Sequence, residues 1–361
     1  MSDYDPEKVF ELQSEAYFLP EGEMKLRLLE EAANMAETGR DVDLLFHIKM
    51  NVVSAAVMGG HLEKGMPAFA WCLAQYQADP ERFSHSEFDI LWNFKNILHS
   101  VDEFPQLALD QVEALRDQMA ALYRASGFNM RPVHYTKLIF AMRAGDFAQA
   151  ADSFADYQAA GRDPMADCLA CEADSDAEYF MLIGENEQAL KAGAKPLSGT
   201  LKCEEVPNRT LNNMLRPLAL LGRYEEADRY QKKGYRLIKS NPVFLGHVGL
   251  QIAYLNHSEQ ETTALKMFET HLPVALDTFQ LRSRCFFYYA AKHLLERLAK
   301  QDAALKLILP QAFPLYQESG EYEVAALIAW LDDQLQPVAA QFDQRNGNQY
   351  HSRELAELLQ Y

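Results

Sequence analysis

One short turn pattern recurs four times along the chain, and it constrains the fold more than any other feature. Each copy is a glycine, a polar residue, three variable positions and an alanine; the copies run from Gly145 to Ala150, Gly184 to Ala189, Gly222 to Ala227 and Gly320 to Ala325. The first three glycines are 39 and 38 residues apart. Glycine permits a tight turn after a helix, and a small alanine lets the next helix approach closely. A period of this length predicts helical hairpins stacked in series.

Hydrophobic periodicity predicts helices throughout the chain. Apolar residues recur every three or four positions, as in Leu44, Ile48, Val52 and Ala55, which places one apolar stripe on a helix. A hairpin leaves an apolar face that only the next hairpin covers, so a series of them forms a superhelix with a concave groove. We therefore predict an all-α fold, an α-α superhelix. An irregular helical bundle is the alternative, and the regular spacing favours the array.

Between residues 130 and 240 the chain resembles the tetratricopeptide repeat (TPR) superfamily. The matching positions are Leu138, Gly145 and Ala150; Leu182, Gly184 and Ala189; Leu215, Gly222, Tyr224 and Ala227; and Asn241-Pro242. The chain departs from the family pattern because it lacks the usual tryptophan early in the first helix. Pro310 and Pro314 also interrupt the expected first helix of the Gly320 copy. The resemblance implies three regions: capping helices at 1–40, a TPR-like array at 41–345 and a C-terminal tail or helix at 346–361.

The net charge and the absence of targeting signals limit the classes of partner and the compartment that we expect. The chain of 361 residues has 52 acidic and 34 basic side chains, a formal charge of −18, which disfavours nucleic acid and anionic membranes as partners. The acidic N-terminus does not resemble a secretory signal. Apolar runs such as 52–58 are far shorter than the ~20 residues that span a bilayer. We expect a cytoplasmic protein whose five cysteines are reduced.

Three cysteines form the sharpest local motif. Cys168 and Cys171 have the spacing at which two thiolates bind one tetrahedral zinc ion, and Cys203 in the next inter-repeat loop would lie at the same edge of the array. The fourth ligand would be water or one of Asp167, Glu204, Glu205 and His247. In a second interpretation the cysteines are small structural residues. A redox motif is less favoured because no βαβ pattern surrounds it. The cofactor is therefore none, or one structural zinc.

The TPR resemblance also implies groove residues. In such units, positions about 13, 10 and 6 before the turn glycine face the groove, which selects Arg209, Asn212 and Arg216 with Asn213 adjacent. Tyr135 and Glu178 occupy matching slots in the two preceding copies. Arginine grips carboxylates, and asparagine pairs with both polar groups of a peptide backbone. A solvated helix face is the alternative interpretation.

The sequence lacks the signatures of common enzymes: it has no P-loop, dinucleotide fingerprint, HExxH or GxSxG. We therefore predict a non-catalytic protein that binds a protein segment or extended peptide in its groove. One alternative is a peptide-regulated signalling regulator, because the length and acidity are similar to those of the Rap-type receptors. Another is a structural or oligomeric scaffold with the aromatic C-terminal half as the contact surface; the sequence leaves the oligomeric state open.

Overall fold

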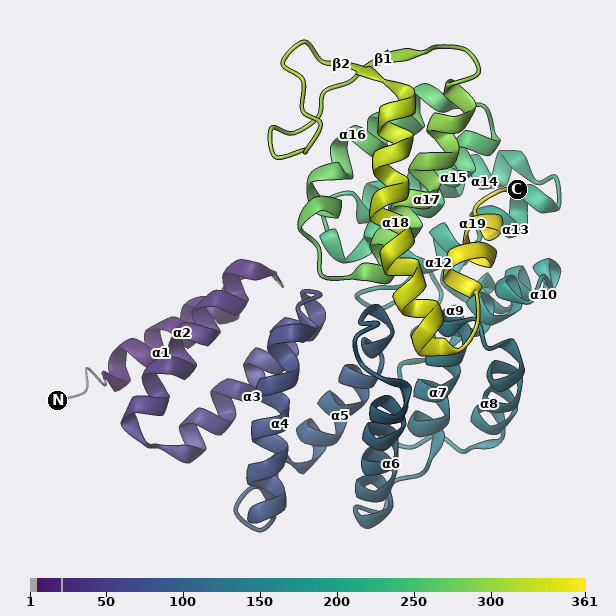
Figure 1. Ribbon diagram of the computed structural model, residues 1–361. Helices are drawn as coiled ribbons and strands as arrows, with labels where there is room; N and C mark the ends of the chain where they lie inside the picture. The colour runs from purple at the N-terminus through teal and green to yellow at the C-terminus, as the bar shows by residue number, and fades with distance from the viewer. Residues whose placement is uncertain (1–4, 21) are drawn as a thin grey trace. The chain divides into compact units, whose positions relative to one another are not determined.

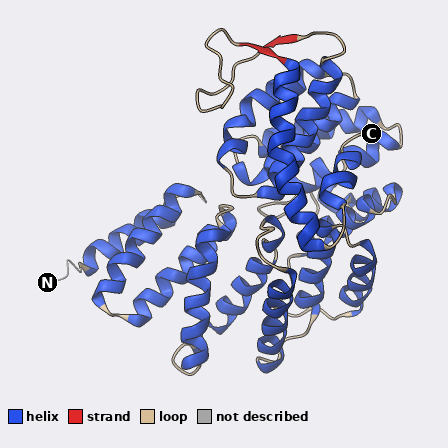
Figure 2. Cartoon of the chain, in the orientation of Figure 1, coloured by secondary structure: helices blue, strands red, loops and turns tan. Residues whose placement is uncertain are grey.

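A computed structural model describes residues 5–20 and 22–361 of the chain. Most of these residues are helical, and the strands among them form one two-stranded antiparallel sheet (Figures 1 and 2). The predicted all-α fold with repeated helical hairpins is confirmed. The predicted cap at 1–40 includes residues 1–4 and 21, which lie outside the described residues. The division into cap, array and tail stays a prediction.

The chain divides into two compact units. Unit 1 comprises Met1–Asp102, Asp110–Thr136 and Asp156–Met165, and unit 2 comprises Glu103–Leu109, Lys137–Ala155 and Ala166–Tyr361. Helices α7 (Arg131–Ala144) and α8 (Phe147–Ala159) each contribute residues to both units.

Unit 1 is built from consecutive helices, and among the first five of them each packs on the next. They are α1 (Pro6–Phe18), α2 (Glu23–Gly39), α3 (Val42–Met58), α4 (Leu62–Ala78), α5 (Glu87–Leu98) and α6 (Leu109–Ala125), with 3₁₀ turns at Ser84–Ser86 and Val101–Glu103. Local chemistry sets the helix ends. Asp41 caps α3 by accepting a hydrogen bond of 3.0 Å from the Leu44 N–H, and Gly60 provides the left-handed turn between α3 and α4 at a φ of 78°.

Unit 2 contains the remaining hairpins and the sheet. Its helices are α9 (Leu169–Leu182), α10 (Asn186–Ala192), α11 (Ala194–Ser198), α12 (Asn208–Asn213), α13 (Leu215–Leu220), α14 (Tyr224–Ile238), α15 (Leu245–His257), α16 (Glu261–Asp277), α17 (Leu281–Leu298), α18 (Val324–Asn346) and α19 (Leu355–Leu358). Strands β1 (Ala304–Lys306) and β2 (Glu321–Glu323) pair between α17 and α18, a 3₁₀ turn spans Pro242–Phe244 and a π-helical turn spans Tyr350–Glu354. The first helices of successive hairpins pack together: α9 on α12, α12 on α15, and α15 on α17.

Three of the four predicted turn glycines start a second helix as expected. Gly145, Gly184 and Gly222 have φ values of 78°, 83° and 72°, in the left-handed region that favours glycine. The alanine of each of these copies, at positions 150, 189 and 227, is fully buried. The spacing of the pattern therefore marks real helix-to-helix contacts.

The fourth copy does not form a helical hairpin, so that prediction is wrong. Gly320 also has a positive φ, but it leads into β2, and its carbonyl accepts a 2.8 Å hydrogen bond from the Leu307 N–H. Ala325 is exposed. The prolines at 310 and 314 explain the difference, because each lacks the N–H that a helix interior requires and the segment before Gly320 therefore stays non-helical.

Residues 347–361 pack on the helices of unit 2. The Tyr350 ring lies against Gly145, and the Tyr289 hydroxyl donates a 2.9 Å hydrogen bond to the His351 carbonyl. The Tyr361 ring stacks on His257 with ring centroids 4.7 Å apart. This C-terminal segment therefore contacts α15 and α17 along part of the face that the first helices of the hairpins form.

Candidate functional site

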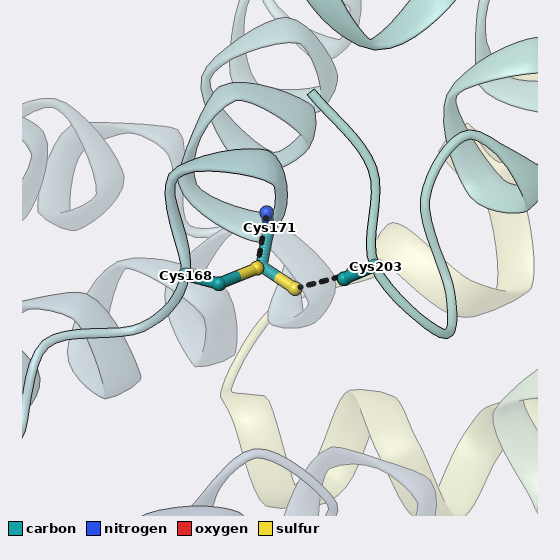
Figure 3. A group of neighbouring side chains, drawn as sticks. All are labelled: Cys168, Cys171 and Cys203. Carbon is teal, nitrogen blue, oxygen red and sulfur yellow. Dashed lines mark hydrogen bonds between the residues drawn. The ribbon is translucent and has the colours of Figure 1, made fainter. Parts of the chain in front are cut away.

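Two of the predicted cysteines begin helix α9. Cys168 is the N-cap residue in an extended conformation, and its Sγ accepts a 3.3 Å hydrogen bond from the Cys171 N–H. An N-cap side chain points at the first free N–H groups of the helix, so both sulfurs lie at the same helix end. Figure 3 shows the two side chains together with Cys203.

Cys203 brings the third sulfur from the loop between α11 and α12. A 2.9 Å hydrogen bond from its N–H to the Val206 carbonyl shapes this loop. The Sγ atoms of Cys171 and Cys203 are 3.4 Å apart, and all three sulfurs lie within 4.8 Å of one another (Figure 3). Thiolates on one tetrahedral zinc ion, at ~2.3 Å from the metal, are roughly 3.8 Å apart. This group of three residues, the thiol cluster, could hold a metal ion.

The protonation state of the cluster ties metal binding to pH. Burial raises the pKa of the Cys171 thiol well above its ordinary value, and the neighbouring Cys168 and Cys203 sulfurs raise it further. Burial also raises the pKa of Cys203, although hydrogen bonds from the backbone of its own loop lower it in part. Both groups therefore hold their protons at neutral pH without a metal. A thiophilic cation has to displace these protons to bind.

The cluster has no carboxylate or imidazole member among the residues that the structure describes. Of the predicted fourth ligands, Glu205 instead pairs with Arg209 at 3.3 Å. His247 is half-buried, and its pKa is lowered well below the ordinary value by desolvation and by the positive charges of Arg209, Arg282 and Arg143. Coordination by Asp167 or Glu204, which adjoin Cys168 and Cys203 in the chain, stays a prediction.

Arg209, predicted to face the groove, is surrounded by carboxylates. Its guanidinium lies 3.2 Å from Asp174, 3.2 Å from Glu178 and 3.3 Å from Glu205. Asp174 is fully buried and accepts a 2.6 Å hydrogen bond from the Thr210 hydroxyl. Burial raises the pKa of Asp174 to about 6, although the Arg209 charge acts in the opposite direction. Arg209 and Glu178 therefore connect α12 to α9.

The other predicted groove residues also make internal contacts. Asn212 is 1% exposed and accepts a hydrogen bond from the Gln251 side chain of α15, while Asn213 is 4% exposed. Arg216 is half-buried, and burial lowers its pKa. Tyr135 is buried in unit 1, where its ring contacts those of His99 and Tyr157. Peptide binding by these residues stays a prediction. Their burial is also expected for residues that only hold neighbouring helices together.

The thiol cluster and the carboxylates around Arg209 belong to one continuous interface between α9 and the segment before and within α12. Cys168, Cys171, Asp174 and Glu178 occur every three or four residues and share one face of α9. The opposing segment, residues 203–210, supplies a thiol, a carboxylate, a guanidinium and a hydroxyl. The thiol cluster is thus one end of a polar seam that joins two successive hairpins.

A cavity in unit 1 was not predicted from the sequence. It has a volume of about 860 Å³, is open to solvent and lies along α2, α3 and α4. Arg27, Asn34, Lys49 and Trp71 are among its lining residues, and the Lys49 Nζ lies 5.4 Å from the centre of the Trp71 ring. The sequence gives one signal for it, a tryptophan in a chain with only three.

No model of a known protein family matches the chain, and no curated protein matches it. Within the ranges 5–20 and 22–361, no helix is both long and apolar enough to cross a lipid bilayer.

Proposed function

We propose that this chain is a non-catalytic binding protein of the TPR superfamily that holds an extended segment of a partner protein. The observation that carries the proposal is the open cavity along α2, α3 and α4, which we call the unit 1 groove. Its volume of about 860 Å³ lies within the range of ~300–1,000 Å³ that ligand sites occupy. An array of hairpins presents such surfaces because each repeat contacts only its neighbours.

The groove lining suits a peptide better than a small metabolite. The Trp71 ring and Pro67 offer an apolar surface for one peptide side chain, and the Asn34 amide can bond both polar groups of a backbone. The charged lining residues are Arg27, Lys49 and Lys64 against Glu30 and Glu31, which leaves one net positive charge in a chain with a net charge of −18. We therefore expect a ligand with an acidic residue next to an apolar one. Nucleic acid and membranes are disfavoured by the overall charge, and a cytoplasmic location would keep the thiols reduced.

A peptide library displayed on phage tests this function, with wild-type protein as bait and selected peptides measured by fluorescence anisotropy. Trp71→Ala should weaken binding at least tenfold, because buried aromatic anchors contribute ~2 kcal/mol or more. Phe88→Ala, which removes a 43%-exposed ring from α5 outside the groove, should leave affinity unchanged. Failure to select any peptide, or equal affinity for the Trp71 variant and the wild type, would contradict the proposal.

We also propose that the thiol cluster binds one structural zinc ion. Three sulfurs within 4.8 Å of one another offer the soft donor set that zinc prefers, and the ion would tie the start of α9 to the loop before α12. Elemental analysis of protein purified without chelator should give about one zinc per chain. Cys203→Ser should abolish it, whereas Cys72→Ala, which removes a buried thiol of unit 1, should not. A zinc-free wild type that also fails to take up added zinc would end this proposal.

A further inference from the structure

Two sulfurs of the thiol cluster are close enough to react with each other. The 3.4 Å between the Cys171 and Cys203 Sγ atoms is shorter than the roughly 3.8 Å that separates two ligands of one zinc ion. A disulfide bond is ~2.05 Å long, so these sulfurs must approach by a little over 1 Å to form one. The exposed loop that carries Cys203 can supply this movement, because residues 202–204 are all exposed.

Exposure distinguishes the cysteines by their access to an oxidant. Cys168 and Cys203 are exposed, and Cys171 is partly covered between them. Cys72 and Cys285 are buried, and burial raises the pKa of each to about 12, so they neither meet an external oxidant nor form thiolate readily. An external reagent therefore reaches the thiol cluster first.

We propose that the thiol cluster is a thiol–disulfide site, at which a low-molecular-weight disulfide such as glutathione disulfide links Cys171 to Cys203 and releases the metal. The inference rests on the zinc site proposed above. Regulation of that site by oxidation follows because two of its three protein ligands are consumed. Cys168 alone cannot retain the ion.

The exchange proceeds in two balanced steps. The Cys203 thiolate attacks one sulfur of glutathione disulfide, whose S–S bond breaks and releases one glutathione thiolate. Cys171 then attacks the Cys203 sulfur of this mixed disulfide, and the second glutathione leaves as a thiolate. Two cysteine thiolates are oxidised, one glutathione disulfide is reduced to two glutathiones, and the zinc ion departs with water as its ligand. Zinc supports the reaction because its bound sulfurs are already deprotonated.

Oxidation would replace the zinc ion by a disulfide bond as the link between α9 and the loop before α12. Zinc and the disulfide both join α9 to the loop before α12, and only the reduced, metal-free protein lacks a link there. In that form the seam keeps the ion pairs of Arg209 with Asp174 and Glu178 and the hydrogen bond from Thr210 to Asp174. We therefore expect the reduced, metal-free form to be the least stable of the three.

The experiment treats zinc-loaded wild-type protein with glutathione disulfide and follows released zinc with a chromogenic chelator, alongside intact mass and peptide mapping. We expect about one zinc released per chain, loss of two hydrogens from the intact mass, and a cross-link between the peptides that contain Cys171 and Cys203. Cys168→Ser should form the same cross-link, and Cys171→Ser should stop at a glutathione adduct on Cys203. The folded state of each variant is checked by circular dichroism.

The outcomes separate the two proposals. A protein that takes up no added zinc but forms the cross-link retains the thiol–disulfide pair and refutes the zinc site. A zinc-loaded protein that ends with a lasting glutathione adduct, or with a cross-link through Cys168, refutes the inference while leaving the zinc site intact. Zinc retention through the treatment also refutes it.

Discussion

Replacing Arg209 with alanine should destabilise unit 2, because the change leaves a fully buried carboxylate without its cation. The Arg209 guanidinium lies 3.2 Å from Asp174, and the two side chains are 16% and 0% exposed. Removing one partner of a buried ion pair typically destabilises a protein by ~3–5 kcal/mol. We expect the lower end, about 3 kcal/mol, because the Thr210 hydroxyl still bonds Asp174 and the carboxyl can take up a proton.

The assay is urea unfolding at pH 7, followed by circular dichroism, with hydrogen exchange in α9 and α12 reporting on unit 2. Arg223→Ala is the matched control, because its ion pair with Glu226 lies at the surface, where such pairs contribute ~1 kcal/mol or less. Combining Arg209→Ala with Asp174→Asn should destabilise less than the sum of the single changes, because the second removes the charge that the first leaves unpaired.

One result would refute this reasoning. If Arg209→Ala unfolds at the same urea concentration as the wild type and also loses peptide binding, Arg209 is a ligand-contacting residue, as the repeat pattern predicts. Equal losses for the variants at Arg209 and Arg223 would likewise show that burial of Asp174 contributes nothing.

Three further predictions concern packing, pH and metal. Gly249→Ala should lower the free energy of unfolding in urea by about 3 kcal/mol, because a Cβ there would lie 2.7 Å from the Phe286 backbone of α17. Gly246→Ala, in the same helix, is the control. A Cβ at position 246 would lie 3.3 Å from its nearest neighbour, so the change should be less than ~1 kcal/mol. The pKa of Asp174 is raised to about 6, so the stability that its protonated form contributes is full below pH 4 and is lost as the pH rises through 6. Asparagine cannot ionise, so the free energy of unfolding of Asp174→Asn should rise relative to that of the wild type by up to ~3 kcal/mol between pH 4 and pH 7. Removing zinc with a chelator under reducing conditions should lower the free energy of unfolding, by ~2.7 kcal/mol if free zinc stood at a hundred times its dissociation constant. This difference should vanish in acid, where protonated thiols no longer bind the ion.

Features determined by local backbone geometry could be predicted from the sequence. Glycine adopts a left-handed turn at the least cost, so Gly145, Gly184 and Gly222 mark hairpins without knowledge of the rest of the fold. The proximity of Cys168 and Cys171 is equally local, since one helical turn separates them. Cys203 could be predicted to lie near Cys168 and Cys171 because hairpins in a series place corresponding loops side by side.

Features determined by tertiary packing could not be predicted. The Gly320 copy matches the same letters, yet the pairing of β1 with β2, which begins directly after Gly320, decides its conformation. Counting along α12 places Arg209 on the side that faces other first helices, but only the packing of α12 on α9 shows that three carboxylates surround it. The unit 1 groove collects side chains from three helices with no motif in common, so nothing in the sequence groups Arg27 with Trp71.

The seam along α9 links the chemistry of the thiol cluster to the stability of the neighbouring hairpins. Cys203, Glu205 and Arg209 belong to one short segment, and each contacts the α9 side or a neighbour within the seam. A constraint on Cys203 therefore also restrains Glu205 and Arg209, which lowers the entropy lost when Arg209 forms its ion pair with Asp174. We therefore expect metal binding or disulfide formation at the thiol cluster to be coupled to the buried ion pair, with contributions to stability that are not additive. A double-mutant cycle between Cys203→Ser and Arg209→Ala, measured on zinc-loaded protein, should therefore give a coupling free energy different from zero, and strictly additive effects would refute the coupling.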